Sequence, residues 1–169
     1  MTQTITSQRP FEANRDAESP NRNLTPITTE LDGTDRLVVG GCRLSDLAER
    51  YGTPLYVLDE ATVRATCRAY RQALEKYYAG PSLPIYASKA NSSLVMSSLA
   101  ASEGMGLDAV SAGELLTALR GGMPGERMVL HGNNKSDDEL LLAYANKVTI
   151  VVDNQHDLDR LAELVPAGS

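Results

Sequence analysis

The chain has 169 residues, which is enough for one ordinary domain with its own hydrophobic core. Its 16 Lys and Arg residues and 22 Asp and Glu residues give a formal net charge of −6. The sequence therefore lacks the overall basic field that attracts nucleic acid or an anionic membrane, and neither is expected as a partner.

Signals for export, membrane insertion and metal binding are also missing from the sequence. No run of about 18 apolar residues indicates a membrane-spanning helix, and the first residues lack the charged and then apolar layout of a secretory signal. The 2 cysteines and 2 histidines stand at unrelated spacings, so neither a metal site nor a disulfide framework is predicted. We therefore expect a cytoplasmic protein.

The first third of the chain divides into two predicted segments. Residues 1 to 34 are rich in Thr, Asn, Pro and Ser without periodicity, which predicts a disordered leader. Residues 35 to 58 predict a strand, a helix and a second strand. In this segment Ser45 is the expected N-cap of a helix from Asp46 to Tyr51, and residues 55 to 58 form the second extended run.

From residue 59 onward the pattern is a regular alternation of helices and strands. A long helix is predicted over 60–78, and two later helix starts carry capping boxes that begin at Ser111 and Ser136. The predicted strands are continuous in apolar residues, as buried parallel strands are. The strands lie near 84–88, 106–110, 127–131 and 148–152, and the helices between and after them near 92–103, 112–120, 137–146 and 156–164. This order predicts a parallel α/β fold, either an open doubly wound sheet or a (β/α) barrel.

Polar residues gather at the carboxyl ends of the four predicted strands, where binding sites form in both architectures. They are Ser88, Lys89 and Asn91; Asp108 and Ser111; His131, Asn133, Asn134 and Lys135; and Asp153 and Asn154. Each also has a purely structural interpretation: Asp and Asn cap helices, Asn pairs form turns, and a histidine at a strand end is often only hydrogen-bonded. Four such ends together favour a site.

Lys89 is the strongest candidate among these residues. A lysine on a buried strand end is partly desolvated, which favours the neutral amine, and a neutral amine can form a Schiff base with a carbonyl. The structural alternative is a side chain that extends to solvent. Lys135 also follows a strand end, but it lies farther into the loop, so we expect it to be more hydrated than Lys89.

Four strings of the sequence resemble the diaminopimelate decarboxylase family in order and separation: GTPLYVLDEATVRATCRAY, YASKAN, GMGLDAVSAGELLTAL and LHGNNKSDDEL. The resemblance covers about residues 36 to 165. It implies a fold-type-III pyridoxal-phosphate enzyme with an alanine-racemase-like (β/α)8 TIM barrel followed by a β domain. The implied reaction is the decarboxylation of meso-2,6-diaminopimelate to L-lysine and CO2, the last step of lysine biosynthesis.

The resemblance also implies roles for individual residues. Lys89 matches the catalytic lysine that holds pyridoxal 5'-phosphate as a covalent aldimine. Asp108 matches a position close to the cofactor, and His131 and Asn133 match a loop at the barrel mouth, so all three are candidate cofactor-binding residues. A small amino-acid substrate and a homodimer are the implied partners, and no metal is implied.

Residues 59 to 169 supply only half of the eight strands that such a barrel requires. We therefore expect the chain to be the N-terminal part of a longer enzyme, with the β domain absent, and to be inactive by itself. Two alternatives stay open. One is a sister decarboxylase acting on arginine, ornithine or carboxynorspermidine, and the other is a non-catalytic carrier of pyridoxal phosphate.

Overall fold

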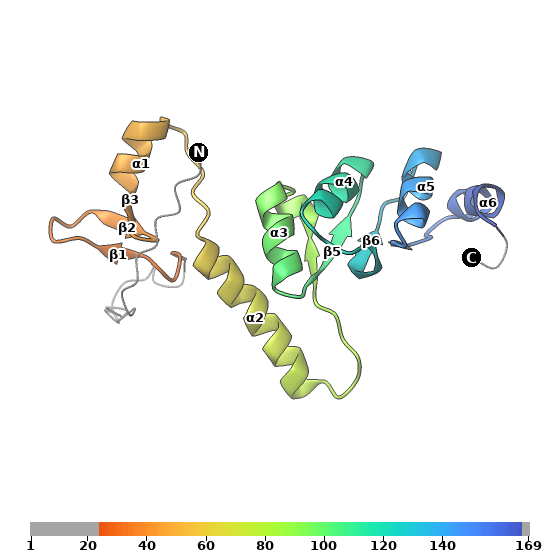
Figure 1. Cartoon of the computed structure of the whole chain (residues 1–169), viewed down its shortest axis with the longest axis horizontal. Helices are drawn as coiled ribbons and strands as arrows, with labels where there is room; N and C mark the ends of the chain where they lie inside the picture. Colours follow the sequence, from red (N-terminus) through yellow and green to blue (C-terminus); the bar gives the residue numbers. More distant parts are fainter. Residues whose placement is uncertain (1–23, 167–169) are drawn as a thin grey trace. The chain divides into compact units, whose positions relative to one another are not determined.

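The structure is a computed structural model, and it describes residues 24 to 166. The chain forms two compact units, Met1–Ala65 and Thr66–Ser169, and the boundary falls within the long helix α2 (Glu60–Tyr77) (Figure 1). Within residues 24 to 166, no helix has both the length and the apolar character of a membrane span.

The first unit contains a small antiparallel sheet and one helix. Strands β1 (Glu30–Leu31), β2 (Leu37–Val39) and β3 (Cys42–Arg43) pair in the order β1-β2-β3, and helix α1 (Leu44–Tyr51) follows directly. Asp32 closes the turn between β1 and β2, because its Oδ1 accepts hydrogen bonds from the Thr34 hydroxyl, the Thr34 N–H and the Arg36 N–H. These bonds, the Thr34 hydroxyl first, hold the pKa of Asp32 well below its usual range.

The structure corrects three predictions for this unit. Residues 24 to 34 were expected to be disordered, yet they include β1, which pairs with β2; residues 1 to 23 of the predicted leader lie outside the described residues. Helix α1 begins at Leu44, and its N-cap is Arg43, whose backbone is extended, so Ser45 does not cap it. Residues 55 to 58 follow Gly52 without forming a strand, and the Tyr56 side chain is fully exposed.

The second unit is built on a four-stranded parallel sheet in the order β4-β5-β6-β7. Its strands are β4 (Ile85–Ala87), β5 (Gly106–Ala109), β6 (Met128–Leu130) and β7 (Thr149–Ile150), each within the predicted range. The strand ends are in register: Ala87 lies opposite Asp108, and Asp108 opposite Val129. The carboxyl ends of all four strands therefore meet at one edge of the sheet.

Helices connect the strands as predicted. They are α3 (Leu94–Ser102), α4 (Ala112–Arg120), α5 (Asp137–Ala145) and, after β7, α6 (Gln155–Leu164). The capping box at Ser136 is complete, because Glu139 N–H donates to the serine hydroxyl and the Glu139 carboxylate accepts from Ser136 N–H. At Ser111 only half is present: its hydroxyl accepts from Glu114 N–H, but the Glu114 carboxylate turns to other partners.

The core lies on one face of the sheet. Side chains alternate across a strand, so Leu107 and Ala109 share a face, and the paired Met128 and Leu130 lie beside them; all four are fully buried. Helices α3 and α4 contact β5, and α5 contacts β7. This arrangement confirms the predicted parallel α/β fold, and the four strands with their helices are consistent with part of a (β/α)8 barrel.

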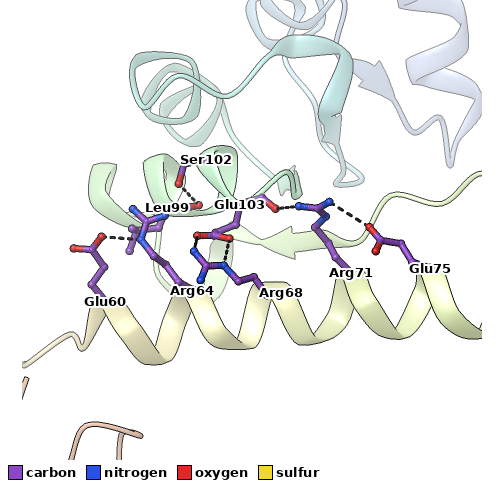
Figure 2. Close-up of polar contacts among 8 residues, drawn as sticks. All are labelled: Glu60, Arg64, Arg68, Arg71, Glu75, Leu99, Ser102 and Glu103. Carbon is purple, nitrogen blue, oxygen red and sulfur yellow. Dashed lines mark hydrogen bonds and ion pairs between the residues drawn. The ribbon is translucent and has the colours of Figure 1, made fainter. Parts of the chain in front are cut away.

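The second half of α2 joins this unit through a polar cluster at the end of α3 (Figure 2). Arg68 donates two hydrogen bonds of 2.7 Å to the two carboxylate oxygens of Glu103, which is buried. Arg71 donates to the Glu103 carbonyl at 3.0 Å. A bidentate pair of this kind fixes both distance and orientation between the two helices.

Candidate functional site

Lys89 lies immediately past the carboxyl end of β4, in the 3-10 helix Ser88–Ala90. The buried residue of this turn is Ser88, whose hydroxyl donates to Glu114 Oε2 at 2.8 Å. Lys89 follows it and is exposed. No hydrogen bond or ion pair joins the Lys89 side chain to another described residue. The strand end thus presents an accessible and unpaired primary amine.

Asp108 and His131 come together at the neighbouring strand ends. Asp108 lies in β5 on the face opposite the buried Leu107 and Ala109, and His131 follows β6. His131 Nδ1 is 3.1 Å from Asp108 Oδ1. Since a carboxylate only accepts hydrogen bonds, Nδ1 is the donor, and the ring has a fixed orientation with Nε2 left available.

The other predicted strand-end residues divide between structural roles and exposed positions. Asn133 and Asn134 are exposed in the loop after β6. Asn154 is the N-cap of α6, since its side chain accepts from Asp157 N–H at 2.8 Å, so the structural interpretation of Asn154 is the one observed. Ser111 likewise caps α4.

Lys135 differs most from its prediction. Its side chain is 2% exposed, and its Nζ lies 2.6 Å from Asp157 Oδ2, whose side chain is 1% exposed. The expectation that Lys135 is more hydrated than Lys89 is therefore wrong. The reason lies in α6: the third residue of that helix reaches back to the loop after β6, which a reading of local sequence around Lys135 does not reveal.

Glu114 and Asp157 are the residues of this region that sequence reasoning missed. Each is the third residue of its helix after an N-cap, and each carboxylate bonds to the loop after an earlier strand. Glu114 Oε2 accepts from Ser88 Oγ at 2.8 Å and from Val110 N–H at 2.7 Å. The helix-cap spacing was a visible signal for both, but it predicts a local bond and not the cross-link between loops.

Tyr86 is the last feature close to Lys89. Its hydroxyl donates to the Asn91 carbonyl at 3.0 Å and spans the turn that carries Lys89. Burial raises the pKa of the Tyr86 hydroxyl above its ordinary value. Among residues 24 to 166, no three His, Cys, Asp or Glu side chains are grouped so that they could hold a metal ion.

These residues fit a cofactor that carries a carbonyl group. An unpaired primary amine can react with a carbonyl carbon. Lys89 is exposed, and the hydrogen bond between Ser88 and Glu114 holds the turn that carries it. The oriented imidazole of His131 and the carboxylate of Asp108 lie on adjacent strand ends of the same sheet.

Comparison with known proteins agrees with this chemistry. Residues 60–169 match the family described as "Pyridoxal-dependent decarboxylase, pyridoxal binding domain". The chain is 44% identical over 154 residues to a diaminopimelate decarboxylase of Synechocystis, covering 86% of this chain and 33% of that protein. It is 46% identical over 142 residues to the diaminopimelate decarboxylase of Bacillus subtilis, covering 79% of this chain and 32% of that one.

Solved structures of decarboxylases also match this chain. The crystal structure of diaminopimelate decarboxylase from M. jannaschii matches with a TM-score of 0.75 and 31% identity, over 81% of this chain and 32% of that one. A lysine/ornithine decarboxylase of Vibrio vulnificus, complexed with putrescine, matches with a TM-score of 0.61 and 26% identity, over 71% of this chain and 32% of that one. The chain thus spans about a third of the length of the relatives it matches. It belongs to the pyridoxal-dependent decarboxylase family.

Proposed function

We propose that this chain supplies the lysine-bearing part of a diaminopimelate decarboxylase, which converts meso-2,6-diaminopimelate to L-lysine and CO2. Relatives that are 44% and 46% identical to this chain carry that name, and a structure of the M. jannaschii enzyme contains L-lysine. The lysine/ornithine enzyme of Vibrio vulnificus is less similar in sequence. The diaminopimelate reaction is therefore favoured over a sister decarboxylation.

The observation that carries the proposal is the position of Lys89. Lys89 is exposed at the carboxyl end of a parallel strand, and the hydrogen bond between Ser88 and Glu114 fixes the turn that carries it. A fixed turn with a free amine holds a nucleophile in place without pairing its charge. We assign Lys89 Nζ as the atom that binds the cofactor aldehyde.

When bound, pyridoxal phosphate supplies an electron-poor ring that accepts the electron pair left by the departing carboxylate. The chain contributes the groups around it. Lys89 Nζ holds the cofactor before substrate arrives and afterwards returns a proton near the reacting carbon. Asp108 orients the His131 ring, and the two together would border the bound cofactor. Asn133 would line the same edge from the loop.

We also propose the assembly and partners of the complete protein. The substrate is a small amino acid, and a homodimer is expected from the family resemblance. Neither nucleic acid nor a membrane is proposed as a partner, since the net charge is −6.

The test uses the complete reading frame that contains this chain, purified with pyridoxal phosphate. We expect CO2 and L-lysine from meso-diaminopimelate, and a loss of turnover by about three orders of magnitude or more in Lys89→Ala. Lys147→Ala, a change at an exposed lysine, is the matched control and should keep the activity. Faster release of CO2 from ornithine or arginine than from diaminopimelate contradicts the proposal.

A further inference from the structure

Lys135 and Asp157 form a buried ion pair at the carboxyl edge of the parallel sheet. Nζ and Oδ2 are 2.6 Å apart, and both side chains are almost fully buried. Burying two charges is costly unless they are paired and hydrogen-bonded. The pair therefore has one strongly preferred geometry, because moving either side chain away would leave the other charge buried without a partner.

One end of this pair is anchored in helix α6. Asp157 N–H donates to Asn154 Oδ1 at 2.8 Å, so the residue is held by the helix cap. Among the described residues, Asp157 Oδ1 has no hydrogen-bond partner, and Lys135 holds the carboxylate through Oδ2. Asp153 Oδ1 lies farther from Lys135 Nζ, at 3.8 Å. Asp157 is thus the principal charge partner of Lys135.

The other end of the pair reaches the loop after β6. Lys135 Nζ also donates a hydrogen bond to the carbonyl of Gly132, the residue after His131. Gly132 has φ +113, a conformation that glycine adopts easily and leaves easily. The bond from Lys135 restricts this permissive residue to one conformation.

His131 is therefore fixed on both sides along the backbone. On the N-terminal side, the His131 N–H donates to the Ala109 carbonyl at 2.8 Å and continues the sheet. On the C-terminal side, the Gly132 carbonyl accepts a hydrogen bond from Lys135. Between these two anchors, the imidazole lies 3.1 Å from Asp108.

We infer that Lys135 and Asp157 are positioning residues, which hold the loop after β6 so that His131 faces Asp108. Neither side chain needs to touch cofactor or substrate. The importance of the His131–Asp108 pair for the reaction rests on the proposed function. The positioning of His131 by Lys135 is a separate claim that is measured without any ligand.

A purely space-filling role is chemically distinguishable from this one. An apolar pair of similar volume removes the cost of burying two charges, and such replacements are often neutral or stabilising. An apolar side chain at position 135 nevertheless supplies no donor to the Gly132 carbonyl. The double change Lys135→Met with Asp157→Leu therefore separates packing from positioning.

The experiment compares thermal unfolding and the NMR signals of the His131 ring in the full 169-residue chain. We expect the double variant to unfold near the temperature of the unmodified chain, while its His131 signals move to the positions that they take in Asp108→Ala. Shifts are referenced to an added standard, because His156 directly precedes the substituted Asp157. Unchanged His131 signals in a folded double variant overturn the inference.

The matched control removes a different ion pair of the same helix. Arg160 in α6 bonds to Asp137 at the start of α5, with Nε 2.8 Å from Oδ1, and its other side-chain partner is Glu163 of its own helix. Arg160→Met should leave the His131 signals in place. If Arg160→Met moves them as far as the double variant does, the docking of α6 and not the Lys135 anchor positions His131, and the inference is wrong.

A second measurement needs no variant and decides the matter if the double variant does not fold. In the unmodified chain, the Lys135 ammonium should give slowly exchanging protons and a through-bond correlation from Nζ to the Gly132 carbonyl carbon. Lys147, whose side chain is 77% exposed, should show neither. Equal exchange at the two lysines overturns the inference. Failure of the proposed function would instead appear as an inactive complete enzyme with these signals intact.

Discussion

The Ser88 hydroxyl donates to Glu114 Oε2 across two neighbouring strand ends, at 2.8 Å. The same oxygen accepts from Val110 N–H at 2.7 Å, so one carboxylate joins the loop after β4 to the loop after β5. Because Ser88 directly precedes Lys89, this bond fixes the turn that carries the proposed nucleophile. Glu114 therefore stabilises the Lys89 turn through its carboxylate and the start of α4 through its N–H, which donates to Ser111.

Replacement of Glu114 should destabilise the chain. Glu114→Ala leaves the buried Ser88 hydroxyl and the Val110 N–H without their acceptor, and an unpaired buried polar group costs about 1–3 kcal/mol. Glu114→Gln keeps one oxygen acceptor, so its loss should be smaller. Urea unfolding measures both variants, and equal free energies of unfolding for Ala and Gln would show that the hydrogen bonds contribute nothing.

Asp108→Ala should change the protonation pattern of the His131 ring. The carboxylate accepts from Nδ1, so its removal lets the proton redistribute between the two ring nitrogens. Long-range proton–nitrogen NMR spectra report that distribution directly. His156 is the control within the same spectrum. A His131 ring that keeps its original pattern in Asp108→Ala is incompatible with the described pair.

The buried carboxylate of Glu103 should contribute more to the free energy of unfolding than the exposed carboxylate of Glu75. Glu103→Gln replaces a charge that receives two hydrogen bonds from Arg68, and we expect a loss of about 1–3 kcal/mol in the free energy of unfolding. Glu75, with a side chain 63% exposed, pairs with Arg71. Glu75→Gln should change the free energy of unfolding by less than about 1 kcal/mol. Equal losses in the two variants would contradict the assigned burial.

Glu139 should contribute to the acid sensitivity of the fold. Hydrogen bonds from Ser136 N–H, then from Ala112 N–H and the Ser136 hydroxyl, lower the pKa of the Glu139 carboxyl below its ordinary value of 4.5. A lowered folded-state pKa means that the stabilisation is present above 4.5 and is lost as pH falls through the folded-state value. Glu139→Gln should therefore be less stable than the unmodified chain at neutral pH.

Urea midpoints of Glu139→Gln and the unmodified chain, measured from pH 7 downward, test this sign. The difference between them should stay constant above about pH 4.5 and shrink below it. A difference that grows as the pH falls would show that Glu139 is stabilised in its protonated form.

The parallel sheet was predictable because its signal is local and repeated. Continuous apolar strands such as 127–131 and the capping box from Ser136 to Glu139 each encode their element within a few residues. The prediction was wrong where pairing decides the outcome. Residues 30 and 31 form a strand only because β2 lies beside them, and residues 55 to 58 are apolar without a strand partner in the described part of the chain.

The site was predictable as a set of strand ends but not as a set of contacts. Parallel register brings Asp108 and the residue after β6 to the same edge, which the order of strands already implies. The order of strands did not predict which individual side chains are buried. Lys89 is exposed because Ser88 takes the buried position of the turn, and Lys135 is buried because Asp157, 22 residues later, receives its charge. Contacts at that separation have no local signature.

The covalent attachment point of the cofactor is the most direct test of the whole account. The chain has four lysines, Lys76, Lys89, Lys135 and Lys147. Borohydride reduction of the complete, pyridoxal-phosphate-loaded protein, followed by peptide mapping, identifies the lysine that carries the cofactor. We predict a single adduct at Lys89, with none at the buried Lys135 or the exposed Lys147. An adduct on any residue other than Lys89 would contradict the account.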